Sequence, residues 1–265
     1  MTVIEALPWD EIKRLTLWDY EQLHAKLAAV LGYPVVWQHY VVPLAQSADM
    51  AHAMLAQSGP HGEEYHAKVM RALDQLEAAG ITDWLDLLKH TNTRTKLISF
   101  IGEYGVSFAT CALVFQYLLR YGLPFLTPCL QLVDADNPAE LAWHQALKDH
   151  HLAHSFDLLQ HGALPQQRAW LAARLGLPLD VVDKLVNRAD LARLPFVRRK
   201  TLLALEGGGL GTLQRLACTP LPIADGLMQA YYDNQPGKSW VVMKRVITLP
   251  AFCQWAAAVP KIVQV

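Results

Sequence analysis

An internal repeat constrains the fold of this chain more than any other feature. Residues 76–125 align with residues 147–196 without a gap, at an offset of 71 positions. Each copy has a glycine at the equivalent place, Gly105 and Gly176, and each ends in the tripeptide Leu-Pro-Phe. The apolar positions between these points also correspond. Turn points and core positions that recur together indicate a duplicated supersecondary unit.

Apolar residues recur at helical spacing along most of the chain. Residues 19–31 place apolar side chains on one helix face and precede Gly32, a typical helix stop, and residues 63–79 follow the same pattern. The β-branched run at residues 35–42 has no partner segment, so we favour a loop or helix over a strand there. We therefore expect an all-α fold of tandem helix-hairpin-helix-like repeats with an N-terminal helical segment.

The repeat divides the chain into three parts. Residues 1–62 are the N-terminal helical segment, residues 63–146 the first repeat, and residues 147–265 the second repeat with C-terminal helices. Three short helices begin in a similar way, at Gly80, His151 and Gly209. Several stacked hairpin units would produce this pattern.

Composition and length are those of a globular protein. The chain has 265 residues, of which 52% are hydrophobic and 18% charged, enough to bury a large core. The longest apolar run, residues 106–119, is shorter than the roughly 20 residues that span a bilayer, which predicts a buried core helix. No basic leader precedes the early acidic residues, and the four cysteines form no C-x-x-C pair. We expect a cytoplasmic protein with buried, reduced thiols.

The near-neutral total charge conceals an asymmetry along the chain. Residues 1–161 hold 10 Lys and Arg against 18 Asp and Glu, while residues 162–265 hold 13 against 6. The net charges are therefore −8 and +7, and all 11 histidines lie in the acidic part. Such a split is compatible with a part that faces nucleic acid. It is equally compatible with two parts that attract each other, within one chain or between copies.

The candidate binding site is the hairpin that ends the second repeat. Residues 190–216 contain a turn at Leu194–Phe196, then a short helix, a glycine stop and a second short helix. Six cationic residues lie in or just before this hairpin: Lys184, Arg188, Arg193, Arg198, Arg199 and Lys200. Three of them fall in the first turn of a helix, where cations are unfavourable unless an anion is near. Contact with phosphates is one interpretation. A solvated surface, or a docking face for the acidic part, is the other.

The second half of the chain resembles a bacterial family known as domain of unknown function 4332. The resemblance covers about residues 147–265 and reaches residues 76–125 through the repeat; its most specific part is the string Asn187–Leu191. The family implies a helical fold with helix-hairpin-helix character and no reaction. DNA-binding hairpins usually carry Gly-hydrophobic-Gly, which lets backbone N–H groups reach a phosphate. Here Phe196 and Arg198 stand at those positions.

Two other patterns are better explained by the fold than by a metal site or a phosphate loop. His150 and His154, close to Asp149 and Asp157, have a spacing that can bind a metal, but no further ligand is in register, so no metal site is predicted. The glycines at 207–211 lack the strand and the Gly-Lys-Ser/Thr ending of a phosphate loop, so we interpret them as a hairpin turn.

The tryptophans at positions 84, 143, 170, 240 and 255 occupy helical apolar positions and are expected in the core. No nucleophile or acid–base signature is visible, and no cofactor is predicted. We expect a non-enzymatic binding protein, with nucleic acid as the candidate ligand. The alternative is a structural or oligomerising module that binds a protein partner or further copies of itself, and neither hypothesis involves a membrane.

Overall fold

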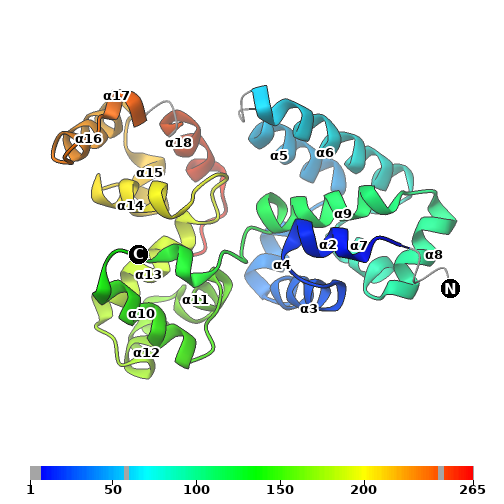
Figure 1. Ribbon diagram of the computed structural model, residues 1–265, viewed down its shortest axis with the longest axis horizontal. Coiled ribbons are helices and arrows are strands. Elements are labelled where there is room, and N and C mark those ends of the chain that lie inside the picture. Colours follow the sequence, from blue (N-terminus) through cyan, green and yellow to red (C-terminus); the bar gives the residue numbers. More distant parts are fainter. Residues whose placement is uncertain (1–6, 57–59, 244–247, 265) are drawn as a thin grey trace. The chain divides into compact units, whose positions relative to one another are not determined.

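The protein is all-α, as the sequence predicts (Figure 1). A computed structural model describes residues 7–56, 60–243 and 248–264, and the side chains of residues 60 and 61 are not described. In these ranges no strand is present, and the only β-type pairing is an isolated bridge between Pro128 and His154. The run at residues 35–42, for which a loop or helix was favoured, forms helix α4 (Pro34–Tyr40).

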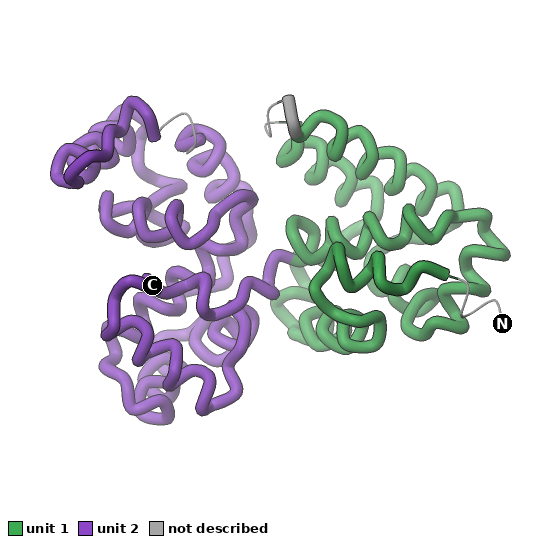
Figure 2. Tube along the Cα trace, in the orientation of Figure 1, with its two compact units in different colours: residues 1–123 green, residues 124–265 purple. Residues whose placement is uncertain are grey.

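The chain forms two compact units, residues 1–123 and residues 124–265 (Figure 2). The boundary differs from the predicted divisions after residues 62 and 146. Helix α5 (Leu44–Leu55) packs on α6 (Pro60–Ala78), which joins the N-terminal segment to the first repeat. Residues 124–146 pack beneath the helices of the second repeat, so they belong to that unit.

The first unit is organised around helix α9 (Phe108–Tyr117), which continues into the π-helical turn η1 (Leu118–Gly122). Helices α2 and α6 pack against it. Most of the apolar run at residues 106–119 is buried, which confirms the predicted core helix. The other helices of this unit are α2 (Trp9–Thr16), α3 (Tyr20–Leu31), α7 (Trp84–Thr91) and α8 (Arg94–Tyr104).

The second unit is organised around helix α13 (Leu179–Leu191), which packs against α11, α12 and α15. Its apolar side chains from Val181 to Leu191 are buried, and so is Arg188 of the candidate site. The remaining elements of this unit are η2 (Cys129–Leu132), α10 (Pro138–Asp149), α11 (Ser155–Gly162), α12 (Pro165–Leu175), α14 (Arg199–Gly207), α15 (Leu213–Cys218), α16 (Leu221–Asp233), α17 (Trp240–Met243) and α18 (Leu249–Ala258).

Helix boundaries in the two aligned segments coincide at the offset of 71 residues. Helices α7, α8 and α9 begin at the positions that correspond to the starts of α11, α12 and α13. The two glycines at the equivalent helix ends, Gly105 and Gly176, both adopt the left-handed conformation, with φ of 69° and 64°. A residue with a Cβ is strained in this conformation, which explains why glycine stands at both helix ends.

Three turns that precede short helices share one backbone geometry. Gly80, His151 and Gly209 have φ values of 80°, 60° and 77°. In each turn the next N–H group donates to the carbonyl five residues earlier: Ile81 to Leu76 at 3.0 Å, Leu152 to Leu147 at 2.9 Å, and Leu210 to Leu205 at 2.7 Å. This bonding pattern satisfies carbonyl groups that a helix end leaves free. The similar helix entries expected from sequence therefore have a common structural basis.

The glycines at 207–211 combine a turn with close packing. A Cβ atom at Gly207 would lie 2.3 Å from the Tyr231 ring, and one at Gly208 would lie 2.6 Å from the Met228 sulfur. Both of these neighbours belong to α16. The glycines thus allow α16 to approach α14, in agreement with the structural interpretation of this segment.

Some expectations about burial need correction. Trp84, Trp240 and Trp255 lie in the core, but Trp143 is half-buried and Trp170 is 56% exposed. Trp170 stacks beneath the Arg174 guanidinium at 5.3 Å, so a cation–π contact on the surface replaces core packing. All four cysteines are free, yet only Cys111 and Cys129 are buried, whereas Cys253 is half-buried and Cys218 is exposed at the end of α15.

Among the described helices, no single one is long and apolar enough to cross a membrane. One pair, residues 94–104 with residues 108–122, passes the length and composition criteria together but is bent by 118°.

A histidine without hydrogen-bond partners lies in the core of the first unit. His24 is 5% exposed, and neither ring nitrogen has a partner among the described residues. Its ring packs 4.5 Å from that of Tyr20 and 5.1 Å from that of Phe115. Burial lowers the pKa of His24 to about 4, although the charge of Glu21 acts in the opposite direction. The folded state therefore holds this imidazole neutral.

His24 should make the first unit sensitive to acid. The unfolded chain takes up a proton near pH 6.5 and the folded chain only near pH 4, so stability falls between these values by at most about 3 kcal/mol. We expect His24→Phe to remove this loss, measured by urea unfolding at neutral and acidic pH. His39→Gln, at an exposed position, is the control and should behave as wild type. An unchanged pH dependence in His24→Phe would contradict the assignment.

Candidate nucleic-acid interface

The six predicted cations divide into two groups by their place in the fold. Lys184 and Arg188 lie on α13, and Arg193 lies just beyond its end. The N-cap residue of α14 is Arg198, which Arg199 and Lys200 follow in the first turn. The turn before α14 therefore separates the three cations on or just after α13 from the three at the start of α14.

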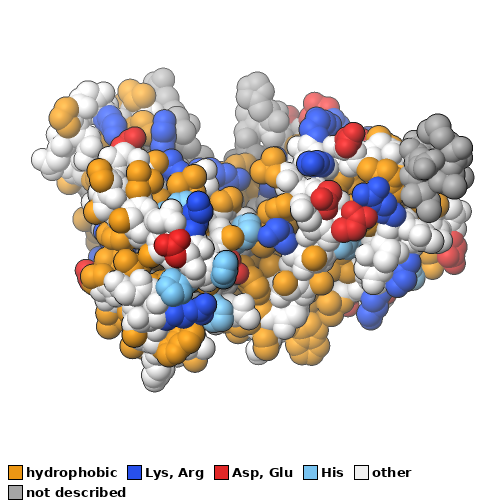
Figure 3. Space-filling view, turned by 60° about the horizontal axis from the view of Figure 1, so that its bottom comes forward, with side chains coloured by type: hydrophobic (Ala, Val, Ile, Leu, Met, Phe, Trp, Pro, Cys, Tyr) orange, Lys and Arg blue, Asp and Glu red, His pale blue; other side chains and the backbone are white. Residues whose placement is uncertain are grey.

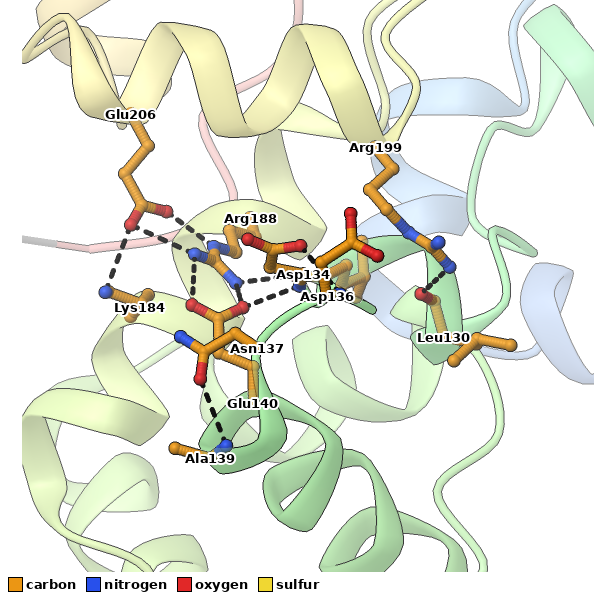
Figure 4. Close-up of polar contacts among 11 residues, drawn as sticks. Leu130, Asp134, Asp136, Asn137, Ala139, Glu140, Lys184, Arg188, Arg199 and Glu206 are labelled. Carbon is orange, nitrogen blue, oxygen red and sulfur yellow. Dashed lines mark hydrogen bonds and ion pairs between the residues drawn. The ribbon is translucent and has the colours of Figure 1, made fainter. Parts of the chain in front are cut away.

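Arg188 is buried at the centre of an ion-pair network, although it was predicted as a ligand contact (Figure 4). Its guanidinium donates to Glu140 of α10 at 2.5 Å and to Glu206 of α14 at 2.5 Å. It also donates to the Leu132 carbonyl at 2.9 Å. The side chain is 2% exposed, so it joins three elements of the second unit instead of facing solvent.

The network keeps both Glu140 and Arg188 ionised despite their burial. Burial alone would raise the pKa of Glu140, but hydrogen bonds from Arg188 and from the Asp134 N–H group lower it below its usual range. Burial alone would lower the pKa of Arg188, but its two carboxylate partners raise it. Because each charge is stabilised by the other, removal of either partner leaves an uncompensated charge in the interior.

Arg193 and Lys184 also bind within the second unit. The Arg193 guanidinium donates to Asp190 at 2.5 Å and to the Pro260 carbonyl at 2.9 Å, and is 0% exposed. The Lys184 ammonium lies 3.1 Å from Glu206. A phosphate contact through Arg188 or Arg193 would therefore require a buried ion pair to open.

The two compact units differ less in net charge than residues 1–161 and residues 162–265 do. Residues 124–161 contain one lysine and five acidic residues, and they fold with the basic part of the chain. One of these acids, Glu140, pairs with Arg188. Part of the attraction expected between an acidic and a basic region is thus satisfied inside the second unit.

The three remaining cations follow a strained turn. Phe196 has a φ of 61°, a conformation that favours glycine, at a position where DNA-binding hairpins usually have glycine. Arg198 and Lys200 are exposed after this turn, and Arg199 is half-buried. Arg199 donates to the Leu130 carbonyl at 2.6 Å, while its Nε atom is buried without a partner.

Folding adds two residues to this group that the sequence analysis did not include. Burial, and then the charges of Lys148 and Arg199, lower the pKa of the His144 imidazole below its usual value. His144 and Lys148 lie on α10, and the charge of Arg199 on α14 also acts on His144. Figure 3 shows a face on which histidines lie among Lys and Arg side chains. We define the cationic face by its five residues: His144, Lys148, Arg198, Arg199 and Lys200.

No sequence motif links the two parts of the cationic face. Lys148 precedes Arg199 by 51 positions, and neither lies in a recognisable ligand motif. The only signal in the sequence was the excess of histidines near α10, a pattern that suggests metal binding instead.

The histidines near α10 serve as helix ends. His150 is the C-cap of α10 and His154 the N-cap of α11, so the two do not share a helix face. Asp157 accepts hydrogen bonds from the N–H groups of Ala153 and His154, both at 2.8 Å. Within the part of the chain that the structure describes, no group of three or more His, Cys, Asp or Glu side chains could hold a metal ion.

Comparison with known proteins identifies one family. Residues 143–233 match the family model described as "Domain of unknown function (DUF4332)". This match confirms the family resemblance inferred from sequence, over a segment that runs from α10 to the end of α16. No curated protein and no solved structure matched the chain.

Breaking the Arg188 network should strongly destabilise the second unit. Arg188→Leu leaves Glu140 buried without its cation, and we expect a loss of about 3–5 kcal/mol in urea unfolding. The double variant Arg188→Leu with Glu140→Leu should lose less, because the buried charge is gone. Lys200→Leu, on the surface, is the control and should change stability little. A loss under about 1 kcal/mol for Arg188→Leu would contradict the central role of this pair.

Proposed function

We propose that this protein is a non-enzymatic binding protein that contacts the phosphate backbone of nucleic acid through the cationic face. One observation carries the proposal: the two charges that act on His144, from Lys148 of α10 and Arg199 of α14, are both positive. Both charges disfavour the protonated imidazole in the unbound protein. A polyanion that spans α10 and α14 would offset this effect.

The start of α14 supports the same conclusion. The first N–H groups of a helix have no partner within the helix and carry a partial positive charge. Arg198, Arg199 and Lys200 add full positive charges beside them. An anion placed at this helix end interacts favourably with both groups.

Cationic side chains, and not backbone N–H groups, would contact the phosphates. The Phe196 side chain is 37% exposed at the turn, and Arg198 stands at the second position where a phosphate-binding hairpin usually has glycine. The Arg198 and Lys200 side chains are exposed, and the Arg198 guanidinium donates to the Val197 carbonyl at 2.9 Å. Contacts of this kind give affinity that depends on salt and little on base sequence.

Charge reversal on the cationic face tests the proposal. We expect the double variant Arg198→Glu with Lys200→Glu to weaken binding of a fluorescein-labelled DNA duplex at least ten-fold at low salt, measured by fluorescence anisotropy. It should also reduce the slope of log affinity against log salt by about 1 to 2, because about 0.9 is lost for each phosphate contact.

The matched control carries the same change in net charge elsewhere. Lys89→Glu with Lys238→Glu reverses two exposed lysines outside the cationic face and should retain most of the binding. Equal losses of DNA affinity in the two double variants would show that the change in net charge alone weakens binding. Wild-type protein that binds neither duplex nor single-stranded DNA at low salt would disprove the proposal.

The imidazole of His144 should make binding depend on pH. Its pKa is lowered in the free protein, so it is neutral near pH 7 and gains its charge only below its usual pKa. A bound phosphate stabilises the charged form, and affinity should therefore rise several-fold as the pH falls below about 6.5. His144→Asn should remove this rise, whereas His90→Asn, in the first unit, should not. A pH dependence that persists in His144→Asn would show that other groups cause it.

A further inference from the structure

Two histidines face each other across the contact between α5 and α6 in the first unit. The Nδ1 atom of His52 lies 3.1 Å from the Nε2 atom of His66, which is a hydrogen-bond distance. The ring centroids are 4.9 Å apart, with an angle of 46° between the ring planes. One ring comes from each helix, so the pair joins two helices that lie side by side (Figure 1).

The packing of the two helices explains why these side chains meet. Helix α5 buries Leu55, and α6 buries Val69. His52 precedes Leu55 by three positions. His66 precedes Val69 by the same interval, so each histidine lies about one helical turn from a buried apolar side chain. His52 is exposed and His66 is half-buried, so an ion from solvent can reach the pair.

The distance between the two nitrogens is that of two ligands on one metal ion. An imidazole nitrogen binds zinc at about 2.0–2.1 Å. Two such nitrogens on one ion are about 2.8 Å apart at a right angle and about 3.4 Å apart at a tetrahedral angle. The observed 3.1 Å lies between these values. A metal ion can therefore replace the hydrogen bond with little movement of either helix.

Binding of a metal ion to the neutral pair needs no net release of protons. A neutral imidazole carries one N–H group and one lone pair, so one of the facing nitrogens donates to the other. When the proton of the donor moves to the other nitrogen of its ring, both facing nitrogens offer lone pairs. Each ring then has the neutral form in which imidazole binds metals.

The charges around the pair favour a cation. Asp49 on α5 and Glu63 on α6 are exposed, and each precedes the histidine of its own helix by three positions. The Lys68 ammonium, which follows on α6, is paired with Glu64 at 2.6 Å. The first unit as a whole has 13 Asp and Glu against 9 Lys and Arg. This excess of negative charge attracts a divalent ion.

We propose that His52 and His66 form a binding site for one divalent transition-metal ion, which links α5 to α6. Within the part of the chain that the structure describes, no third His, Cys, Asp or Glu completes a group around them, so water fills the remaining positions. Two imidazoles suit Ni²⁺, Cu²⁺ and Zn²⁺, whereas Mg²⁺ prefers oxygen ligands. The proposal concerns the first unit and is independent of nucleic-acid binding at the cationic face.

Nickel serves as the probe, because imidazole binds it well. The full chain, prepared without a histidine tag, is dialysed to equilibrium against NiCl₂, and the bound nickel is measured by elemental analysis. We expect one tightly bound ion per chain. An equal concentration of MgCl₂ should not displace it, because Mg²⁺ requires oxygen ligands.

Glutamine variants separate metal binding from the hydrogen bond. A glutamine amide can donate and accept a hydrogen bond but does not replace an imidazole as a nickel ligand. His52→Gln and His66→Gln should each remain folded by circular dichroism and bind nickel about ten-fold or more weakly, because one imidazole is lost. The matched control is His39→Gln with His90→Gln, on α4 and α7, which should bind as wild type. Cys218→Ser, which removes an exposed thiol, should do the same.

Two further measurements locate the ion. Bound nickel should slow the modification of His52 and His66 by diethyl pyrocarbonate, but not that of His39. Amide hydrogen exchange in α5 should also slow, because an ion that links α5 to α6 opposes their separation. At a free nickel concentration of about ten times the dissociation constant, openings that break the site become roughly ten-fold rarer.

Three results would overturn the proposal. One is that the wild type binds no nickel at about 100 µM free ion. Another is that His52→Gln and His66→Gln bind nickel as tightly as the wild type, or that the control variants lose as much affinity as they do. The third is that bound nickel leaves the modification of His52 and His66 unchanged.

Discussion

The second unit depends on one buried guanidinium. Arg188 joins α10, α13 and α14 through Glu140 and Glu206, and it also holds η2 through the Leu132 carbonyl. A buried ion pair contributes little net stability compared with apolar packing, but it penalises any arrangement that separates the charges. Its main effect is therefore to fix how α10 and α14 lie on α13. The cationic face, built from α10 and α14, depends on that arrangement.

The repeated turns explain how similar sequences reach similar local structure in both units. At Gly80, His151 and Gly209 a left-handed residue ends one helix, and a buried apolar residue follows it. This residue anchors the turn while its N–H group satisfies a free carbonyl of the helix. Such turns are local, so they form in each unit without help from the other. The specialisation of the second unit comes from its charged residues and not from its turns.

Local features were predictable from the sequence, and the partners of charged residues were not. The apolar periodicity predicted helices such as α3 and the buried α9, and the glycine pattern predicted where helices end. The sequence could not show that Arg188 and Arg193 are buried, because a cation beside a hairpin looks the same whether its carboxylate partner is near or absent. Glu140 precedes Arg188 by 48 residues, and only the fold brings them together. His144 joined the cationic face for the same reason.

The burial of some predicted cations narrows the part of the surface that could contact a polyanion. If all six predicted residues were exposed, the hairpin would present a general positive surface. Because Lys184, Arg188 and Arg193 are bound to carboxylates, the candidate contact narrows to the start of α14 and to His144 and Lys148 on α10. The second unit thus uses three of the predicted cations within its own fold, and the candidate contact rests on the other three.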